Sequence, residues 1–67
     1  MTAIPMEKPS VPLGKIKSFG AFGPKYQVGE LLRPTEERDW MVRITLLDSG
    51  EETEYRYSRL IEDPEGV

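Results

Sequence analysis

The longest regular pattern in this chain runs from Trp40 to Leu47, where an entirely apolar set of every second residue alternates with Met41, Arg43, Thr45 and Leu47. Successive side chains of a β-strand point to opposite faces, so this spacing predicts a strand that turns every second residue inward. The inward set is Trp40, Val42, Ile44 and Leu46. A turn-forming run, DSGE at 48–51, comes next, and a second strand-like segment follows it and ends at Tyr57. The pattern therefore predicts a β-hairpin over residues 40–57.

The register of this hairpin follows from matching the apolar faces of its two strands. A two-residue loop at 49–50, or a four-residue loop at 48–51, gives the same pairing. That pairing joins Ile44 with Tyr55, Val42 with Tyr57, and Leu46 with Thr53. A three-residue loop would instead set Ile44 against Glu54 and turn one strand inside out. We therefore expect the first register, in which aromatic and β-branched side chains meet.

A short strand is predicted over residues 14–19, with Ile16 facing inward and Lys15 and Lys17 facing outward. The segment at 20–24 contains two glycines, which permit the backbone angles of a tight loop. The two aromatic residues around this loop are expected in the core: Phe19 and Phe22.

The next strand is predicted over residues 26–32. Its inner face carries Tyr26, Val28 and Leu32, and its outer face carries Leu31. Glu30 is the exception, because the alternation places this acidic residue on the inner face. A helix through this region would be broken at its third turn by Pro34.

The two ends of the chain differ from its centre. Three prolines favour a disordered arm over residues 1–13, which leaves residues 14–64 as a single small β domain. Ser58 can cap one helical turn that ends before Pro64, and residues 65–67 are expected to fray.

The predicted fold class is all-β: a small twisted antiparallel meander of about four strands, with one short C-terminal helical turn. An SH3-like half-barrel is one form that such a meander can take, and an α+β arrangement is the alternative if the C-terminal turn extends. The expected core consists of Ile16, Phe19, Val28, Leu32, Trp40, Val42, Ile44, Leu46, Tyr55, Tyr57 and Leu60.

Composition limits the chemistry of a 67-residue chain that contains neither Cys nor His. Disulfides, thiolate metal sites and the commonest general base are therefore absent. The acidic residues fall mainly in turns and do not follow a calcium-loop spacing. We expect no enzymatic activity, no catalytic residue, no metal site and no cofactor. No apolar run reaches the length of a membrane span and no signal-peptide pattern begins the chain, so we expect a cytoplasmic protein.

The net charge of −3 hides two halves of opposite sign. Residues 1–33 carry five basic and two acidic side chains, and residues 34–67 carry four arginines and ten acidic side chains. An acidic face favours a protein partner with a basic surface, and the chain can be a monomer or a homodimer. The predicted contact surface is an apolar centre with an acidic rim: Met41, Leu47, Asp48, Glu51, Glu52 and Glu54.

This reading suggests a non-enzymatic inhibitor or regulator of a nucleic-acid-handling protein, similar in kind to anti-CRISPR proteins or antitoxins. The alternative is a small barrel that binds nucleic acid through its basic N-terminal half. The residues for that alternative are Lys15, Lys17, Lys25 and Arg43, with Phe19 or Phe22 beside them.

Several local motifs resemble those of a small bacterial family known as a domain of unknown function. They are the stretch Gly-Lys-Ile-Lys-Ser-Phe-Gly-Ala-Phe-Gly-Pro from Gly14, the pair Asp39-Trp40, the turn at 49–51, and Tyr55 to Pro64. The resemblance spans residues 14–65. It implies a bacterial or mobile-element setting, and it supplies no activity, cofactor or partner.

Overall fold

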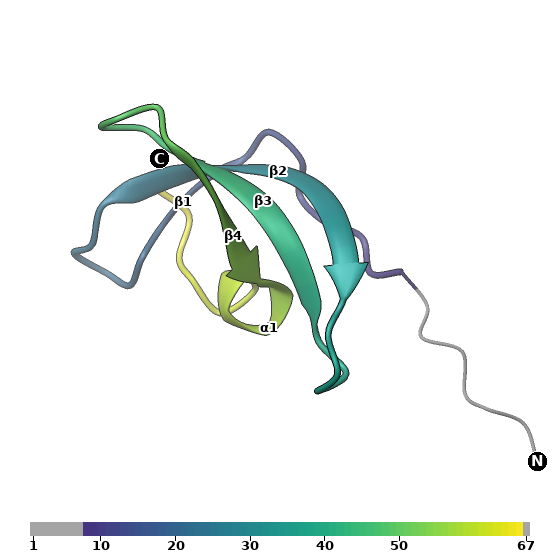
Figure 1. The fold of residues 1–67 in the computed structure, drawn as a ribbon. Helices are drawn as coiled ribbons and strands as arrows, with labels where there is room; N and C mark the ends of the chain where they lie inside the picture. Colours follow the sequence, from purple (N-terminus) through teal and green to yellow (C-terminus); the bar gives the residue numbers. More distant parts are fainter. Residues whose placement is uncertain (1–7, 67) are drawn as a thin grey trace, which may run out of the picture.

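The computed structural model describes residues 8–66, which form one curved antiparallel sheet (Figure 1). Its elements are β1 (Ile16–Ser18), β2 (Lys25–Pro34), β3 (Trp40–Leu46), β4 (Glu52–Arg56) and the single-turn helix α1 (Tyr57–Leu60). Each strand pairs with its neighbours in the sequence, so the sheet order is β1-β2-β3-β4. The predicted all-β meander with a short C-terminal helical turn is confirmed, while an SH3-like closure stays a prediction.

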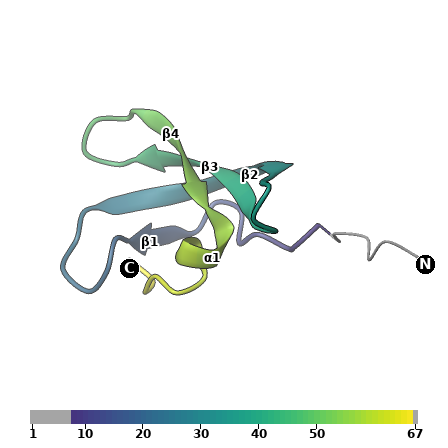
Figure 2. The same cartoon turned by 60° about the horizontal axis from the view of Figure 1, so that its bottom comes forward.

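The core lies on one face of the sheet, and α1 packs against that face at β3 and β4 (Figure 2). Its fully buried side chains are Tyr26, Val28, Val42, Ile44 and Leu60. Half-buried side chains surround them: Val11, Phe19, Leu31, Leu46, Tyr55 and Tyr57. Burying one such aliphatic side chain contributes about 1.5–3 kcal/mol, so the contact of Leu60 with the sheet offsets part of the conformational entropy lost when this single helical turn forms. Within residues 8–66, no helix has the length and apolar character needed to cross a membrane.

The inner face of β2 differs from the prediction because the strand contains two irregularities. The pairing of β2 with β3 shifts by one residue between Val28 and Leu31, and again between Leu31 and Arg33. The first β-bulge reverses the alternation, so Leu31 turns toward the core, and the expected inward position of Leu32 is wrong. Gly29 lies at this bulge, where an added Cβ would stand 2.8 Å from the carbonyl oxygen of Arg43. The close approach of the two backbones explains the glycine.

The facing of β1 is the reverse of the prediction. Lys17 pairs with Tyr26 and turns inward, where its ammonium donates a hydrogen bond to the carbonyl of Leu60. Lys17 is therefore buried, whereas Ile16 is only half-buried. The alternation in such a short strand fixes neither face. The carbonyl of Leu60, at the end of α1, accepts from the Asp63 amide and from the lysine. Phe22 is also misplaced by the prediction, because its side chain is fully exposed in the β1–β2 loop.

The β3–β4 hairpin has the predicted faces, but its register differs from the expected one by two residues. Val42 pairs with Tyr55 and Ile44 with Thr53. The loop occupies residues 47–50, and the amide of Leu46 donates to the carbonyl of Glu51. A two-residue turn of type I′ at 49–50 would need a positive φ at both positions, and only Gly50 has one. Because the shift is an even number of residues, the inward side chains remain inward.

Three residues of the expected core lie outside the core cluster. Ile16, Leu32 and Trp40 are each half-buried. Ile16 and Leu32 are displaced by the changes in β1 and β2 described above, and Trp40 lies at the end of the sheet beside α1.

The segments that precede and follow the strands in the sequence are both packed against the sheet. At the C-terminal end, the amide of Gly66 donates to the carbonyl of Ile16 and the amide of Ser18 donates to the carbonyl of Pro64. Residues 64–66 therefore cover the edge of β1, an edge that would otherwise expose unpaired backbone groups. Of residues 65–67, which were predicted to fray, 65 and 66 are held there, and 67 lies outside the described part of the chain. Within the predicted arm, residues 1–7 lie outside the described part of the chain, and Val11 packs against the core.

Candidate functional site

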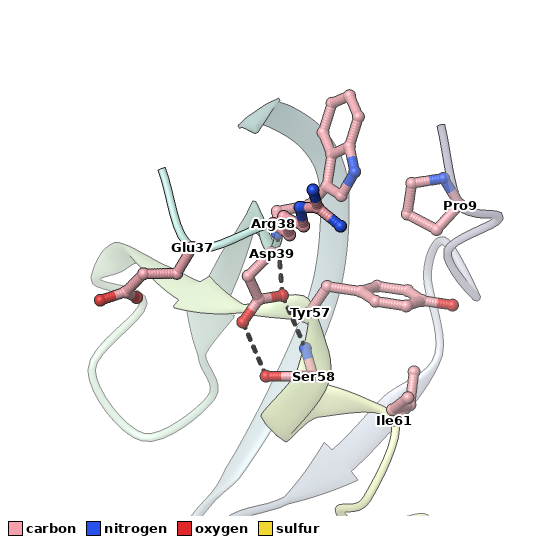
Figure 3. A pocket seen from close by; sticks show the side chains of 8 residues that line it. Pro9, Glu37, Arg38, Asp39, Tyr57, Ser58 and Ile61 are labelled. Atoms are coloured by element: carbon pink, nitrogen blue, oxygen red, sulfur yellow. Dashed lines mark hydrogen bonds between the residues drawn. The ribbon is translucent and has the colours of Figure 1, made fainter. Parts of the chain in front are cut away.

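A shallow cleft of about 390 Å³ opens where β3 begins and α1 lies beside it (Figure 3). Its walls come from four separate segments of the chain: the N-terminal arm, the β2–β3 turn, the start of β3, and α1 with the residue that follows it. The lining residues are Pro9, Glu37, Arg38, Asp39, Trp40, Tyr57, Ser58 and Ile61. Its volume lies at the lower end of the range of ligand-binding clefts, about 300–1,000 Å³.

The turn between β2 and β3 forms one side of the cleft. The Thr35 hydroxyl accepts hydrogen bonds from the backbone amides of Glu37 and Asp39, at 3.2 and 3.1 Å. The Thr35 amide in turn donates to the carbonyl of Asp39 at 2.8 Å. Arg38, between them, has a positive φ of 63°, a conformation that costs a non-glycine residue about 1–2 kcal/mol. The turn thus holds the exposed guanidinium of Arg38 at the rim of the cleft.

Asp39 joins this turn to α1. Its carboxylate accepts hydrogen bonds from the Trp40 amide at 2.8 Å, the Ser58 amide at 3.1 Å and the Ser58 hydroxyl at 2.7 Å. Arg56, at the N-cap position of α1, makes no side-chain cap, so Asp39 caps the helix from another element. Burial alone would raise the pKa of Asp39. The hydrogen bonds from Ser58 and Trp40, with the nearby charge of Arg56, outweigh burial and lower that pKa.

The rest of the cleft is aromatic and aliphatic. Trp40 and Tyr57 are half-buried, while Ile61 keeps 54% of its surface exposed. The Tyr57 hydroxyl donates a hydrogen bond to the carbonyl of Ser10 in the arm, at 3.3 Å. The cleft therefore offers apolar surface and a cation. Its phenolic donor is engaged by the arm, and its Asp39 carboxylate already accepts three hydrogen bonds. Such a set suits binding better than proton transfer.

The outer face of the sheet carries a series of ion pairs. Arg33 donates two hydrogen bonds to Glu54, at 2.6 and 3.1 Å, and Arg43 lies between Glu30 at 3.6 Å and Glu52 at 3.8 Å. The hydrogen bond and charge of Arg33 lower the pKa of Glu54. Each pair is solvent-exposed and contributes little to stability on its own. Together they leave a face of mixed charge.

The six residues predicted to bind a protein partner do not form one patch. Met41 is half-buried at the start of β3, opposite Arg56, and Leu47 lies in the hairpin loop at the other end of the strand, about 20 Å away at 3.3 Å per residue. Asp48 and Glu51 are exposed near Leu47 at the hairpin tip. The two remaining residues, Glu52 and Glu54, are paired with arginines on the outer face. Leu31, which the prediction placed on the outer face, turns toward the core.

The residues of the nucleic-acid alternative are also divided. Lys15 and Lys25 are exposed, but Lys17 is buried on the inner face of the sheet. Arg43 lies on the outer face between two carboxylates. Of the two candidate stacking residues, Phe19 packs in the core, with its ring centroid 4.6 Å from that of Tyr26, whereas Phe22 is exposed.

The residues of the cleft were not identified from the sequence. Strand alternation placed Trp40 and Tyr57 in the core, and nothing local connects them with Pro9. One signal was available, namely the Pro-x-x-Pro spacing of Pro9 and Pro12 in a chain with an aromatic residue at the start of a strand.

Comparison with known proteins agrees with the resemblance seen in the local motifs. A protein of Haemophilus influenzae, itself uncharacterized, is 53% identical over 55 residues, which cover 82% of this chain and 87% of that relative. A family model described as a family of unknown function, DUF5397, matches residues 4–66, a span that includes the sheet, α1 and every lining residue of the cleft. The chain therefore belongs to DUF5397.

Proposed function

We propose that this domain is a non-enzymatic protein-binding module whose contact surface is the cleft beside Trp40. The observation that carries the proposal is the exposure of apolar and aromatic surface there, with 54% of Ile61 accessible, next to a hydrogen-bond donor. Protein interfaces concentrate binding energy in such centres, where aromatic side chains and arginine are enriched. Trp40, Tyr57 and Arg38 supply these residue types.

The distribution of charge supports this choice over the acidic hairpin. A basic partner that docked on the outer face would have to displace arginines from Glu52 and Glu54, which are their present partners. Separating exposed pairs costs little, but the new contacts would gain correspondingly little. The hairpin tip keeps Asp48 and Glu51 exposed, so an inhibitor of a basic partner would have to act through this tip.

Two matched substitutions distinguish the cleft from the tip. Ile61→Glu places a charge in the cleft, and Leu47→Glu does the same at the hairpin tip, where 46% of Leu47 is exposed. Both sites are accessible enough for the domain to tolerate the change. The parent and both variants are immobilised and exposed to bacterial lysate, and the captured proteins are identified by mass spectrometry. Each captured protein is then purified, and its affinity is measured for the parent, for Ile61→Glu and for Leu47→Glu.

We expect the affinity of a specific partner to fall at least tenfold with Ile61→Glu and to stay within twofold with Leu47→Glu. A tenfold loss corresponds to about 1.4 kcal/mol, less than the cost of burying an unpaired charge. The reverse result would contradict the proposal and favour the acidic hairpin tip. Glu51→Lys then tests whether charge or apolar contact dominates at that tip.

A further inference from the structure

The chain places a proline-containing segment of its own against the cleft. Pro9 forms part of the wall, and Figure 3 shows it near Tyr57 and Ile61 around the same hollow. The next residue, Ser10, accepts a hydrogen bond from the Tyr57 hydroxyl through its backbone carbonyl, at 3.3 Å. Val11 then packs against the core. Residues 9–12 read Pro-Ser-Val-Pro, the Pro-x-x-Pro spacing of extended recognition segments.

These contacts reproduce the chemistry by which extended proline segments are recognised. Proline fixes φ and restricts the residue before it, so such a segment loses little conformational freedom when it binds. A carbonyl of such a segment can accept from an aromatic hydroxyl, while a proline ring packs on aromatic surface. In the arm these roles fall to the Ser10 carbonyl and the Pro9 ring, since the carbonyls of Val11 and Pro12 accept from the amides of Leu13 and Lys15. Tyr57 supplies the donor, and Trp40 and Tyr57 supply the surface.

We infer that the cleft recognises an extended, proline-containing segment of a partner protein, and that residues 9–12 compete for it within the same chain. This inference rests on the proposed function and specifies its ligand. The cavity of about 390 Å³ is the space that remains open beside Pro9. A partner segment can enter this space and displace the arm. Competition within the chain lowers the apparent affinity by the fraction of molecules whose cleft is free.

The test uses the full chain and two synthetic peptides. One peptide carries residues 8–13, Lys-Pro-Ser-Val-Pro-Leu, and the other has alanine in place of both prolines. Binding is followed by the fluorescence of Trp40, the single tryptophan, and by the backbone amide shifts of Trp40 and Ser58. The protein variants are Tyr57→Phe, Pro9→Ala and the matched control Pro24→Ala, an exposed proline that precedes β2 and does not line the cleft.

We expect saturable binding of the proline peptide and at least tenfold weaker binding of the alanine peptide. Tyr57→Phe removes a hydrogen bond from the peptide and from the competing arm alike, so it is measured in the Pro9→Ala variant, where the arm is loosened. There it should weaken binding about 2- to 10-fold, the range for one neutral hydrogen bond. Pro9→Ala should strengthen it at least twofold, because the competing segment is loosened, and Pro24→Ala should leave it unchanged.

Two results would overturn the inference. Equal binding of both peptides at the cleft amides would remove the proline preference and leave the proposed function standing. Absence of amide shifts at the cleft in the Pro9→Ala variant, with a normal circular dichroism spectrum, would refute recognition of such segments. The comparison of Ile61→Glu with Leu47→Glu tests the proposed function independently of these two results.

Discussion

Replacing Asp63 with alanine should destabilise the domain strongly, because two tyrosines depend on this one carboxylate. Oδ2 of Asp63 accepts hydrogen bonds from the hydroxyls of Tyr26 at 2.7 Å and Tyr55 at 2.9 Å. The two rings contact each other, with centroids 5.5 Å apart, and Tyr26 is fully buried. The carboxylate thereby ties the residues after α1 to β2 and β4.

The magnitude follows from the burial of the two donors. Leaving a buried donor without a partner costs about 1–3 kcal/mol. The hydroxyl of the fully buried Tyr26 falls in the upper part of that range, whereas Tyr55 is half-buried and can reach water. The Asp63→Ala substitution should therefore cost about 2–4 kcal/mol in total. A domain of this size rarely has more than about 3–5 kcal/mol of stability, so a large part of the variant should be unfolded at 25 °C.

Urea unfolding, followed by far-UV circular dichroism and by Trp40 fluorescence, measures this loss. Glu62→Ala is the matched control, because Glu62 is an exposed carboxylate next to Asp63 in the sequence. It should change the free energy of unfolding by no more than about 0.5 kcal/mol. The same Asp63→Ala change is then made in a chain with Tyr26→Phe and Tyr55→Phe. If its cost stays the same there, the hydrogen bonds do not carry the effect and the reasoning is refuted.

Further predictions concern pH, β2 and the β1–β2 loop. Burial, followed by the hydrogen bond and charge of Asp63, raises the pKa of Tyr55 to about 12 and raises that of Tyr26 as well. Since the folded chain holds these protons more tightly than the unfolded chain, their contribution to the free energy of unfolding should be fully present below pH 10 and should fall as pH rises from 10 through 12. The urea midpoint should fall over the same range, and an unchanged midpoint would contradict this prediction. Gly29→Val should cost about 1–3 kcal/mol in urea unfolding, since the added Cβ would stand 2.8 Å from a backbone carbonyl oxygen, and a neutral result would mean that the bulge relaxes freely. Phe22→Ser should leave the free energy of unfolding almost unchanged in urea, because the ring is fully exposed. A loss of stability above about 1 kcal/mol would show an unrecognised contact of the ring.

The order and pairing of the strands could be predicted because they depend on local pattern. Val42 and Ile44 alternate with polar residues, and this alternation places both on the core face whichever loop closes the hairpin. The register could not be fixed in the same way. Shifts of two residues conserve the faces, so the choice between them depends on which loop residue adopts a positive φ, here Gly50.

The errors in β1 and β2 have a different origin. In β2 the sequence did contain a warning, since the simple alternation placed Glu30 on the inner face and Gly29 lay beside it. A glycine next to a misplaced charge is typical of a bulge, and the bulge restores the faces by turning Leu31 inward. Lys17 gave no such warning. Its partner is the carbonyl of Leu60, 43 positions away, and no local pattern can supply such a partner.

The candidate cleft depends on the same kind of distant contact. Alternation places Trp40 on the same face of the strand as Val42, but it does not determine how deeply a residue on that face is buried. Trp40 pairs with Pro34, the last residue of β2, and the pairing of β4 ends at Arg56, opposite Met41. The sheet therefore stops beside Trp40, and the residues around it come from the arm, the β2–β3 turn, and α1 with the residue after it. An aromatic residue at the end of a strand can thus follow the pattern of a core residue and still be accessible to a partner, which is why the cleft could be found only after the chain was folded.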